Sequence, residues 1–183
     1  MKAVMVSIQP KWVEKICCGK KTIEVRKTRP QLDTPFKCYI YCTKASKSEN
    51  VLLFENSGEC VGFGDYRNAG RNFDGTAWHI GNGKVIGEFV CDRIDYWQYH
   101  YKSDVMHIAD MSELSCVSIE DLLKYSNGGE TTIYGWHISD LVIYDEPKLL
   151  GEFFTPIGKR PSYMLERPPQ SWQYVEEKEN KDE

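Results

Sequence analysis

The chain has 183 residues, a formal net charge of −4 and 41% hydrophobic residues. This length suits one domain with its own core, and the negative net charge argues against a protein that coats nucleic acid non-specifically. No apolar run reaches the length of a transmembrane helix, and the N-terminus lacks the apolar core of a signal peptide. We therefore expect a soluble cytoplasmic protein with no membrane partner.

Charged residues and cysteines are unevenly distributed. Residues 1–50 hold 11 Lys and Arg against 4 Asp and Glu, which is compatible with attraction of phosphate groups or with a merely solvated surface. The seven cysteines include no C-x-x-C pair, and the four histidines show no metal-ligand spacing with them. We expect reduced thiols, no metal site and no cofactor.

The first elements follow from local patterns. Residues 2–8 alternate as a strand does, and residues 10–18 predict a helix because a proline opens them and an apolar stripe runs through them. Gly19 suits the left-handed position after a helix. Ile23 and Val25 then alternate with polar residues, which indicates a half-buried strand.

The segment between this helix and strand has the pattern G-x-K-x-x-E-x-R, formed by Gly19, Lys21, Glu24 and Arg26. Alternation puts Lys21 at the strand's entrance, on the face of its apolar residues, and puts Glu24 and Arg26 on the other face. A plain alternative is a surface ion pair between Glu24 and Arg26, with Lys21 reaching into solvent.

These positions resemble the signature of the ASCH domain, a small β-barrel of the PUA-like superfamily. The resemblance extends upstream to residues 7–12 and downstream to residues 134–138, and it covers roughly residues 2 to 146. It implies an α+β fold, a PUA-like mixed β-barrel, for which we expect five to seven strands and two main helices near residues 10–18 and 118–126.

The resemblance also implies a site that binds RNA or a modified nucleoside or nucleotide. Lys21, Glu24 and Arg26 would line its cleft, and we expect Ser7 and Gln9 to supply hydrogen-bonding groups at the edge. These ligands are the expected partners; the oligomeric state stays open.

Two other functions stay open. Some ASCH-like proteins are amidohydrolases of acylated cytidine that use a lysine, a threonine and a distant glutamate. Lys21 matches the lysine, Glu24 stands in place of the threonine, and Glu113 is a loose match for the distant acid. In a hydrolase of a nucleoside amide or of RNA, Lys21 and Glu24 would be catalytic. The third reading is an interaction scaffold without a small ligand.

Further strands and a second helix are predicted along the rest of the chain. Residues 37–43 and 84–91 predict strands, and residues 118–125 predict a helix with a serine N-cap. The seven glycines of residues 58–83 indicate a long insertion. His137, Ser139 and Asp140 are residue types of a catalytic triad, but their spacing in the sequence does not by itself establish one. We expect a domain over residues 1–146 and an extended C-terminal arm with a charged tail over 147–183, packed on the same domain. The predicted core includes Ile23, Val25, Ile40, Val85 and Phe89.

Overall fold

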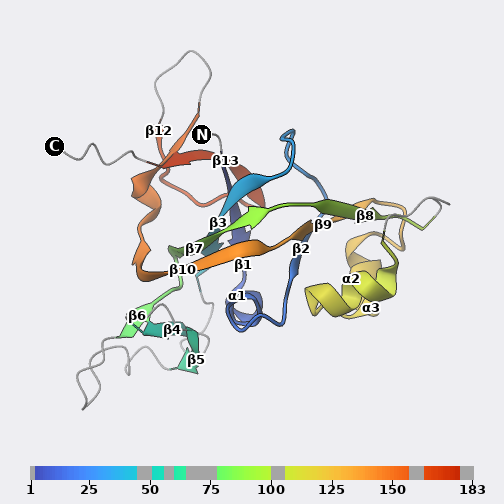
Figure 1. Ribbon diagram of the computed structural model, residues 1–183, viewed down its shortest axis with the longest axis horizontal. Helices are drawn as coiled ribbons and strands as arrows, with labels where there is room; N and C mark the ends of the chain where they lie inside the picture. The colour runs from blue at the N-terminus through green and yellow to red at the C-terminus, as the bar shows by residue number, and fades with distance from the viewer. Residues whose placement is uncertain are drawn as a thin grey trace.

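The computed structural model describes residues 3–44, 51–55, 60–64, 78–99, 106–156 and 163–177. The fold is mixed α+β (Figure 1). Its elements in chain order are β1 (Ala3–Ile8), α1 (Pro10–Cys17), β2 (Ile23–Arg26), β3 (Phe36–Cys42), β4 (Val51–Glu55), β5 (Cys60–Gly64), β6 (Trp78–Ile80), β7 (Lys84–Cys91), β8 (Ile94–Trp97), α2 (Ile108–Ser115), α3 (Ile119–Tyr125), β9 (Ile133–His137), β10 (Ser139–Lys148), the 3-10 helix η3 (Leu150–Glu152), β11 (Phe153–Thr155), β12 (Tyr163–Met164) and β13 (Trp172–Glu177).

The centre of the fold is a seven-stranded sheet with the strand order β10-β7-β3-β1-β13-β11-β12. In this sheet β1 pairs in parallel with β3 and antiparallel with β13. All six residues of β1 are buried, with Val4, Val6 and Ile8 in one core cluster and Ala3 and Met5 in another. The sheet is therefore covered on both faces, which explains why this strand reads as an almost continuous apolar run.

Two three-stranded sheets complete the described strands, in the orders β2-β9-β8 and β5-β4-β6. The antiparallel pair β7–β10 continues directly into the pair β8–β9, and β2 pairs with the far side of β9. A third core cluster lies between this part of the fold and the helices α2 and α3; it includes Ile23, Val25, Met111 and Leu122.

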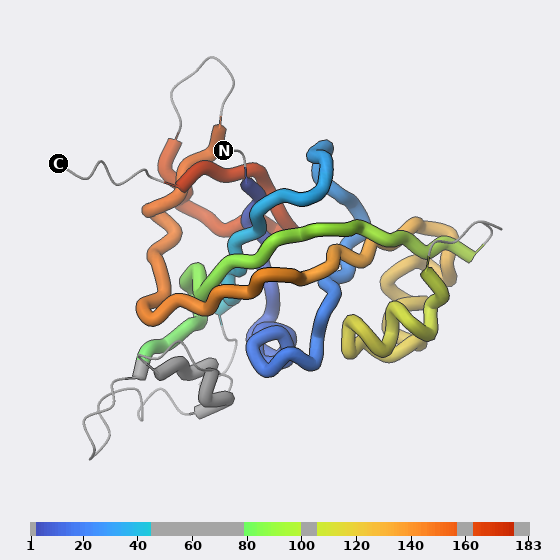
Figure 2. Tube along the Cα trace, in the orientation of Figure 1, coloured from blue at the N-terminus to red at the C-terminus, as the bar shows by residue number. Residues whose placement is uncertain are grey.

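The predicted barrel is wrong in that the large sheet is not closed among the described strands. The edge of β1 opposite β3 is occupied by β13, so it is not free to pair with β2. Figure 2 shows the red C-terminal segment lying against the blue N-terminal strand. Five to seven strands were expected for the barrel; the described residues form thirteen strands, seven of them in the large sheet and three in each smaller sheet.

The core prediction is confirmed, because Ile23, Val25, Ile40, Val85 and Phe89 are each at most 8% exposed. The helices α1 and α3 form where expected, and the Ser118 side chain accepts a hydrogen bond from the Asp121 backbone as an N-cap. The helix α2 was not predicted.

The predicted glycine-rich insertion of residues 58–83 lies largely outside the described residues; the described part contributes β5 and β6. Within the described residues, no helix combines the length and the apolar character that crossing a bilayer requires.

Candidate functional site

The turn that joins α1 to β2 places the motif residues at the site. Gly19 adopts φ 71°, a conformation that costs glycine little, and the backbone N–H groups of Lys20 and Lys21 both donate to the Lys15 carbonyl at 2.9 Å. These bonds reverse the chain at the end of the helix. Lys21 therefore precedes β2, which starts at Ile23, and strand alternation does not fix the direction of its side chain.

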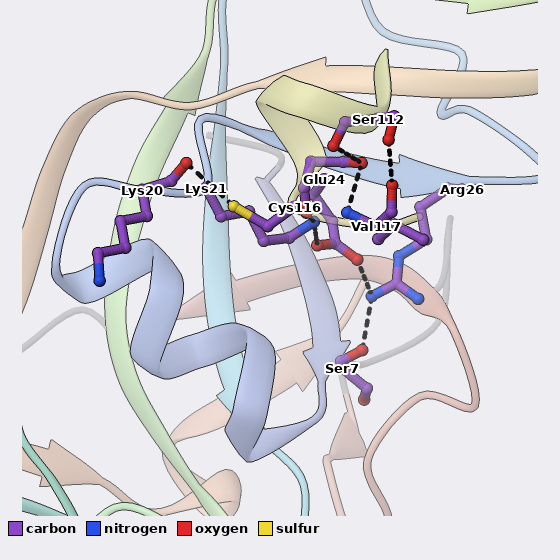
Figure 3. Close-up of polar contacts among 9 residues, drawn as sticks. Ser7, Lys20, Lys21, Glu24, Arg26, Ser112, Cys116 and Val117 are labelled. Carbon is purple, nitrogen blue, oxygen red and sulfur yellow. Dashed lines mark hydrogen bonds and ion pairs between the residues drawn. The ribbon is translucent and has the colours of Figure 1, made fainter. Parts of the chain in front are cut away.

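Lys21, Glu24 and Arg26 form one continuous chain of charges (Figure 3). The Lys21 ammonium lies 3.2 Å from Glu24 Oε2 and donates to the Ser115 carbonyl at 3.0 Å. The Arg26 guanidinium lies 3.0 Å from Glu24 Oε1 and donates to the Ser7 carbonyl at 2.6 Å. One carboxylate thus sits between two cations.

This charge chain is buried. The side chains of Lys21, Glu24 and Arg26 are 2%, 8% and 13% exposed. The alternative of a surface ion pair with Lys21 in solvent is therefore wrong. A buried lysine needs a partner, and here Glu24 and the Ser115 carbonyl supply it. Two cations against one anion also leave one positive charge in excess in a poorly solvated place.

All five residues predicted for the site border one cavity of about 480 Å³. Its walls come from the end of β1 and the residues after it, from α1, from β2, from α3 and from the C-terminal segment. The lining residues are Ser7, Ile8, Gln9, Lys11, Trp12, Lys21, Glu24, Val25, Arg26, Thr43, Val117, Asp121, Leu122, Tyr125 and Gln170. That these side chains bind a ligand, or that Lys21 and Glu24 are catalytic, stays a prediction.

Two aromatic rings of this cavity were not predicted as site residues. Trp12 on α1 is half-buried, and Tyr125 at the end of α3 is 36% exposed. Lysine ammonium groups lie over both rings. Lys11, Lys15 and Lys21 lie 4.6, 5.1 and 5.5 Å from the centre of the Trp12 ring. Lys27 lies 4.7 Å from the centre of the Tyr125 ring.

Ser7 and Gln9 differ in what they offer to a ligand. The Ser7 hydroxyl donates to the Pro169 carbonyl at 2.6 Å, and its backbone carbonyl accepts from Arg26, so this residue mainly holds the walls together. Gln9 is exposed and occupies the N-cap position of α1 without a side-chain cap bond, which leaves its amide available. Gln170 is an exposed second amide on the cavity wall, and no sequence pattern indicated it.

Two polar atoms of the motif lack a hydrogen-bond partner among the described residues. These are Glu24 Oε2 and Arg26 Nε, both fully buried. Glu24 Oε2 is close enough to Lys21 for an ion pair, but the geometry is not that of a hydrogen bond. Buried polar atoms are nearly always hydrogen-bonded, so these two atoms are exceptions among the described residues.

Other predicted chemistry is not found at this cavity. Glu113 is exposed on α2 and does not line it; Asp121 is the acid at the cavity apart from Glu24. His137 Nε2 lies 2.7 Å from Asp95, and the Ser139 hydroxyl donates to the Val90 carbonyl, so His137 and Ser139 do not form a triad with Asp140. The described residues contain no group of three His, Cys, Asp or Glu side chains that could hold a metal ion.

Comparison with known proteins gives a likeness in fold. No protein-family model and no curated protein matches the sequence. The crystal structure of ASCH from Zymomonas mobilis has 16% identity and a TM-score of 0.49, with 95% of this chain and 87% of that chain covered. A variant of that protein gives 15% identity and a TM-score of 0.48, with 97% and 93% covered. These two structures are what this chain is similar to in the course of its backbone.

Proposed function

We propose that the cavity beside the G-x-K-x-x-E-x-R motif binds RNA or a nucleoside or nucleotide, including modified forms. The observation that carries this proposal is that one cavity joins a buried excess of positive charge to two partly exposed aromatic rings. Its volume of about 480 Å³ lies in the range of pockets that hold small ligands. We also propose that the fold is of the PUA-like class.

Each part of the cavity suits one part of a nucleotide. The Trp12 and Tyr125 rings can stack on a base, as aromatic side chains do for unpaired bases. Three cationic side chains, Lys11, Lys21 and Arg26, line the cavity with two anionic ones, Glu24 and Asp121, which leaves one positive charge in excess. A phosphate or a base carbonyl is attracted to this charge.

Hydrolysis of a nucleoside amide or of RNA is a second candidate, favoured by the buried pair of Lys21 and Glu24 at the cavity. The geometry supports binding better. Both oxygens of Glu24 face cations, and the Lys21 ammonium is already held by Glu24 and the Ser115 carbonyl. These are fixed charges of the kind that orient a ligand.

A binding titration tests the proposal. Fluorescein-labelled single-stranded RNA hexamers are titrated with the protein, and unlabelled nucleosides and nucleotides compete. Trp12→Ala and Tyr125→Ala should each weaken binding about 5- to 150-fold, because stacking on one ring contributes about 1–3 kcal/mol per base. Tyr163→Ala is the matched control, since Tyr163 is 57% exposed and lies outside the cavity.

The same samples separate the alternatives. Release of acetate from N4-acetylcytidine by the wild type, abolished in Lys21→Met, would favour the hydrolase. Binding without product favours the binding module. If neither binding nor product is found for any nucleoside, nucleotide or hexamer offered, the proposal is overturned and the interaction scaffold is the remaining hypothesis.

A further inference from the structure

The C-terminal segment forms part of the cavity wall. We call residues 169–177 the docked arm; it contains β13. Its backbone follows β1 antiparallel, with Val6 opposite Trp172, and the Ser7 N–H donates to the Ser171 carbonyl at 2.9 Å. This pairing carries Gln170 to the cavity, where it is a lining residue.

Ser7 connects the docked arm to the charge chain of the motif. Its hydroxyl donates to the Pro169 carbonyl at 2.6 Å, while its own carbonyl accepts from Arg26 at 2.6 Å. Ser7 is 8% exposed. If the arm left β1, the Ser7 N–H and hydroxyl would lose their partners at the residue that also holds the Arg26 guanidinium.

Gln170 brings to this wall a kind of group that the charged residues do not have. Lysine and arginine side chains only donate hydrogen bonds, and ionised carboxylates only accept them, whereas an amide does both. Gln170 is exposed, and continuing the strand register from Val6 opposite Trp172 puts it opposite Ile8, the residue before Gln9. Gln9 and Gln170 both line the cavity. Glutamine amides recognise base edges that present a donor beside an acceptor.

We propose that Gln170 is a specificity-determining contact for the ligand, and that ligand binding and arm docking stabilise each other. The proposal rests on the proposed function, since the ligand it concerns is an RNA base or a nucleotide. Reciprocity follows from linkage: a ligand that contacts the docked arm binds that state more tightly, so it must also strengthen docking.

The arm is also anchored far from the cavity, which allows the linkage to be tested without changing the cavity. Glu177, at its end, accepts from the Tyr39 hydroxyl at 2.8 Å and pairs with Lys148. None of these three residues lines the cavity. Glu177→Gln should therefore loosen docking and leave the ligand contacts in place.

The first test compares Gln170→Ala with Gln173→Ala, a matched change on the same arm at a residue that does not line the cavity. Affinity is measured for labelled oligo-U, oligo-C and oligo-A hexamers, with thermal unfolding as the check on folding. Gln170→Ala should weaken binding of the preferred hexamer about 3- to 10-fold, the effect of one or two neutral hydrogen bonds, and should reduce the differences in affinity among the three hexamers. Gln173→Ala should change neither the affinity nor the preference among hexamers.

The second test measures linkage. Saturation with the preferred hexamer should slow hydrogen exchange at the backbone amides of residues 172–177, and Glu177→Gln should weaken binding of that hexamer. Equal affinities and base preferences for Gln170→Ala and Gln173→Ala would overturn the specificity role, and arm exchange unchanged at saturation would overturn the linkage. A wild type that binds no hexamer or nucleotide would overturn the proposed function and this proposal together. If Tyr125→Ala weakens binding but Gln170→Ala does not, only the role of Gln170 fails.

Discussion

Glu24→Gln should destabilise the protein far more than the loss of an ordinary ion pair. The change removes the one anion between two buried cations, Lys21 and Arg26. Breaking a buried ion pair from one side costs about 3–5 kcal/mol of unfolding free energy. We expect about 3 kcal/mol, the low end, because Lys21 keeps the Ser115 carbonyl and Arg26 keeps the Ser7 carbonyl.

The assay is denaturant unfolding together with a thermal scan. For a chain of this length, a loss of about 3 kcal/mol lowers Tm by roughly 6–12 °C. Glu120→Gln is the control, because Glu120 pairs with Lys124 at 2.9 Å in solvent and its side chain is 79% exposed. That change should cost less than about 0.5 kcal/mol.

A double variant shows whether the charges act together. Lys21→Met combined with Glu24→Gln should lower the unfolding free energy by less than the sum of the single changes, by about 1 kcal/mol or more, because the double variant has no buried ammonium at position 21 left without its carboxylate. A cost below about 1 kcal/mol for Glu24→Gln alone, or strict additivity in the double variant, would refute the buried charge chain.

Two further predictions concern groups away from the cavity. Burial alone would raise the pKa of Glu88, but hydrogen bonds from Lys37 and Tyr144 and the charges of Lys37 and Lys148 outweigh it and lower that pKa. The stabilisation from Glu88 is therefore present above the unfolded value of about 4.3 and is lost as pH falls through the lower folded pKa. In denaturant unfolding, Glu88→Gln should lower the free energy of unfolding by about 1–2 kcal/mol at pH 7 and by much less at pH 3. An equal loss of unfolding free energy at the two pH values would contradict this. Burial, with the charge of Asp92, raises the pKa of the Cys91 thiol to about 12. Iodoacetamide at pH 8 should thus label exposed Cys18 and spare Cys91 in the folded protein, as peptide mass spectrometry can check; equal labelling would contradict the burial of Cys91.

The elements that sequence predicted well are those fixed by neighbouring residues. The proline at the start of α1, the glycine after it and the Ser118 cap act within a few residues, and their helices form as expected. The helix α2 escaped prediction because it buries only Met111 and Ser115 and so shows a weak apolar stripe.

Features fixed by distant residues could not be predicted. Closure of the sheet depends on which strand pairs with the edge of β1 opposite β3. This strand is β13 in the docked arm, and the hydrogen bond from Ser7 to Pro169 spans 162 positions in the chain. The direction of Lys21 depends on the Ser115 carbonyl, 94 positions away. For the same reason the motif indicated the charged wall of the cavity, while Tyr125 and Gln170 came only with the packing of α3 and of the arm.

Photo-crosslinking tests most directly whether this cavity is the ligand site. A single-stranded RNA hexamer that contains 5-bromouridine is irradiated with the wild-type protein, and the crosslinked peptides are identified by mass spectrometry. Because bromouridine crosslinks to aromatic side chains with which it stacks, we expect crosslinks at Trp12 and Tyr125, reduced by competing nucleotide. Crosslinks confined to other aromatic residues, such as Tyr96 and Tyr134 around a separate pocket, would contradict the account.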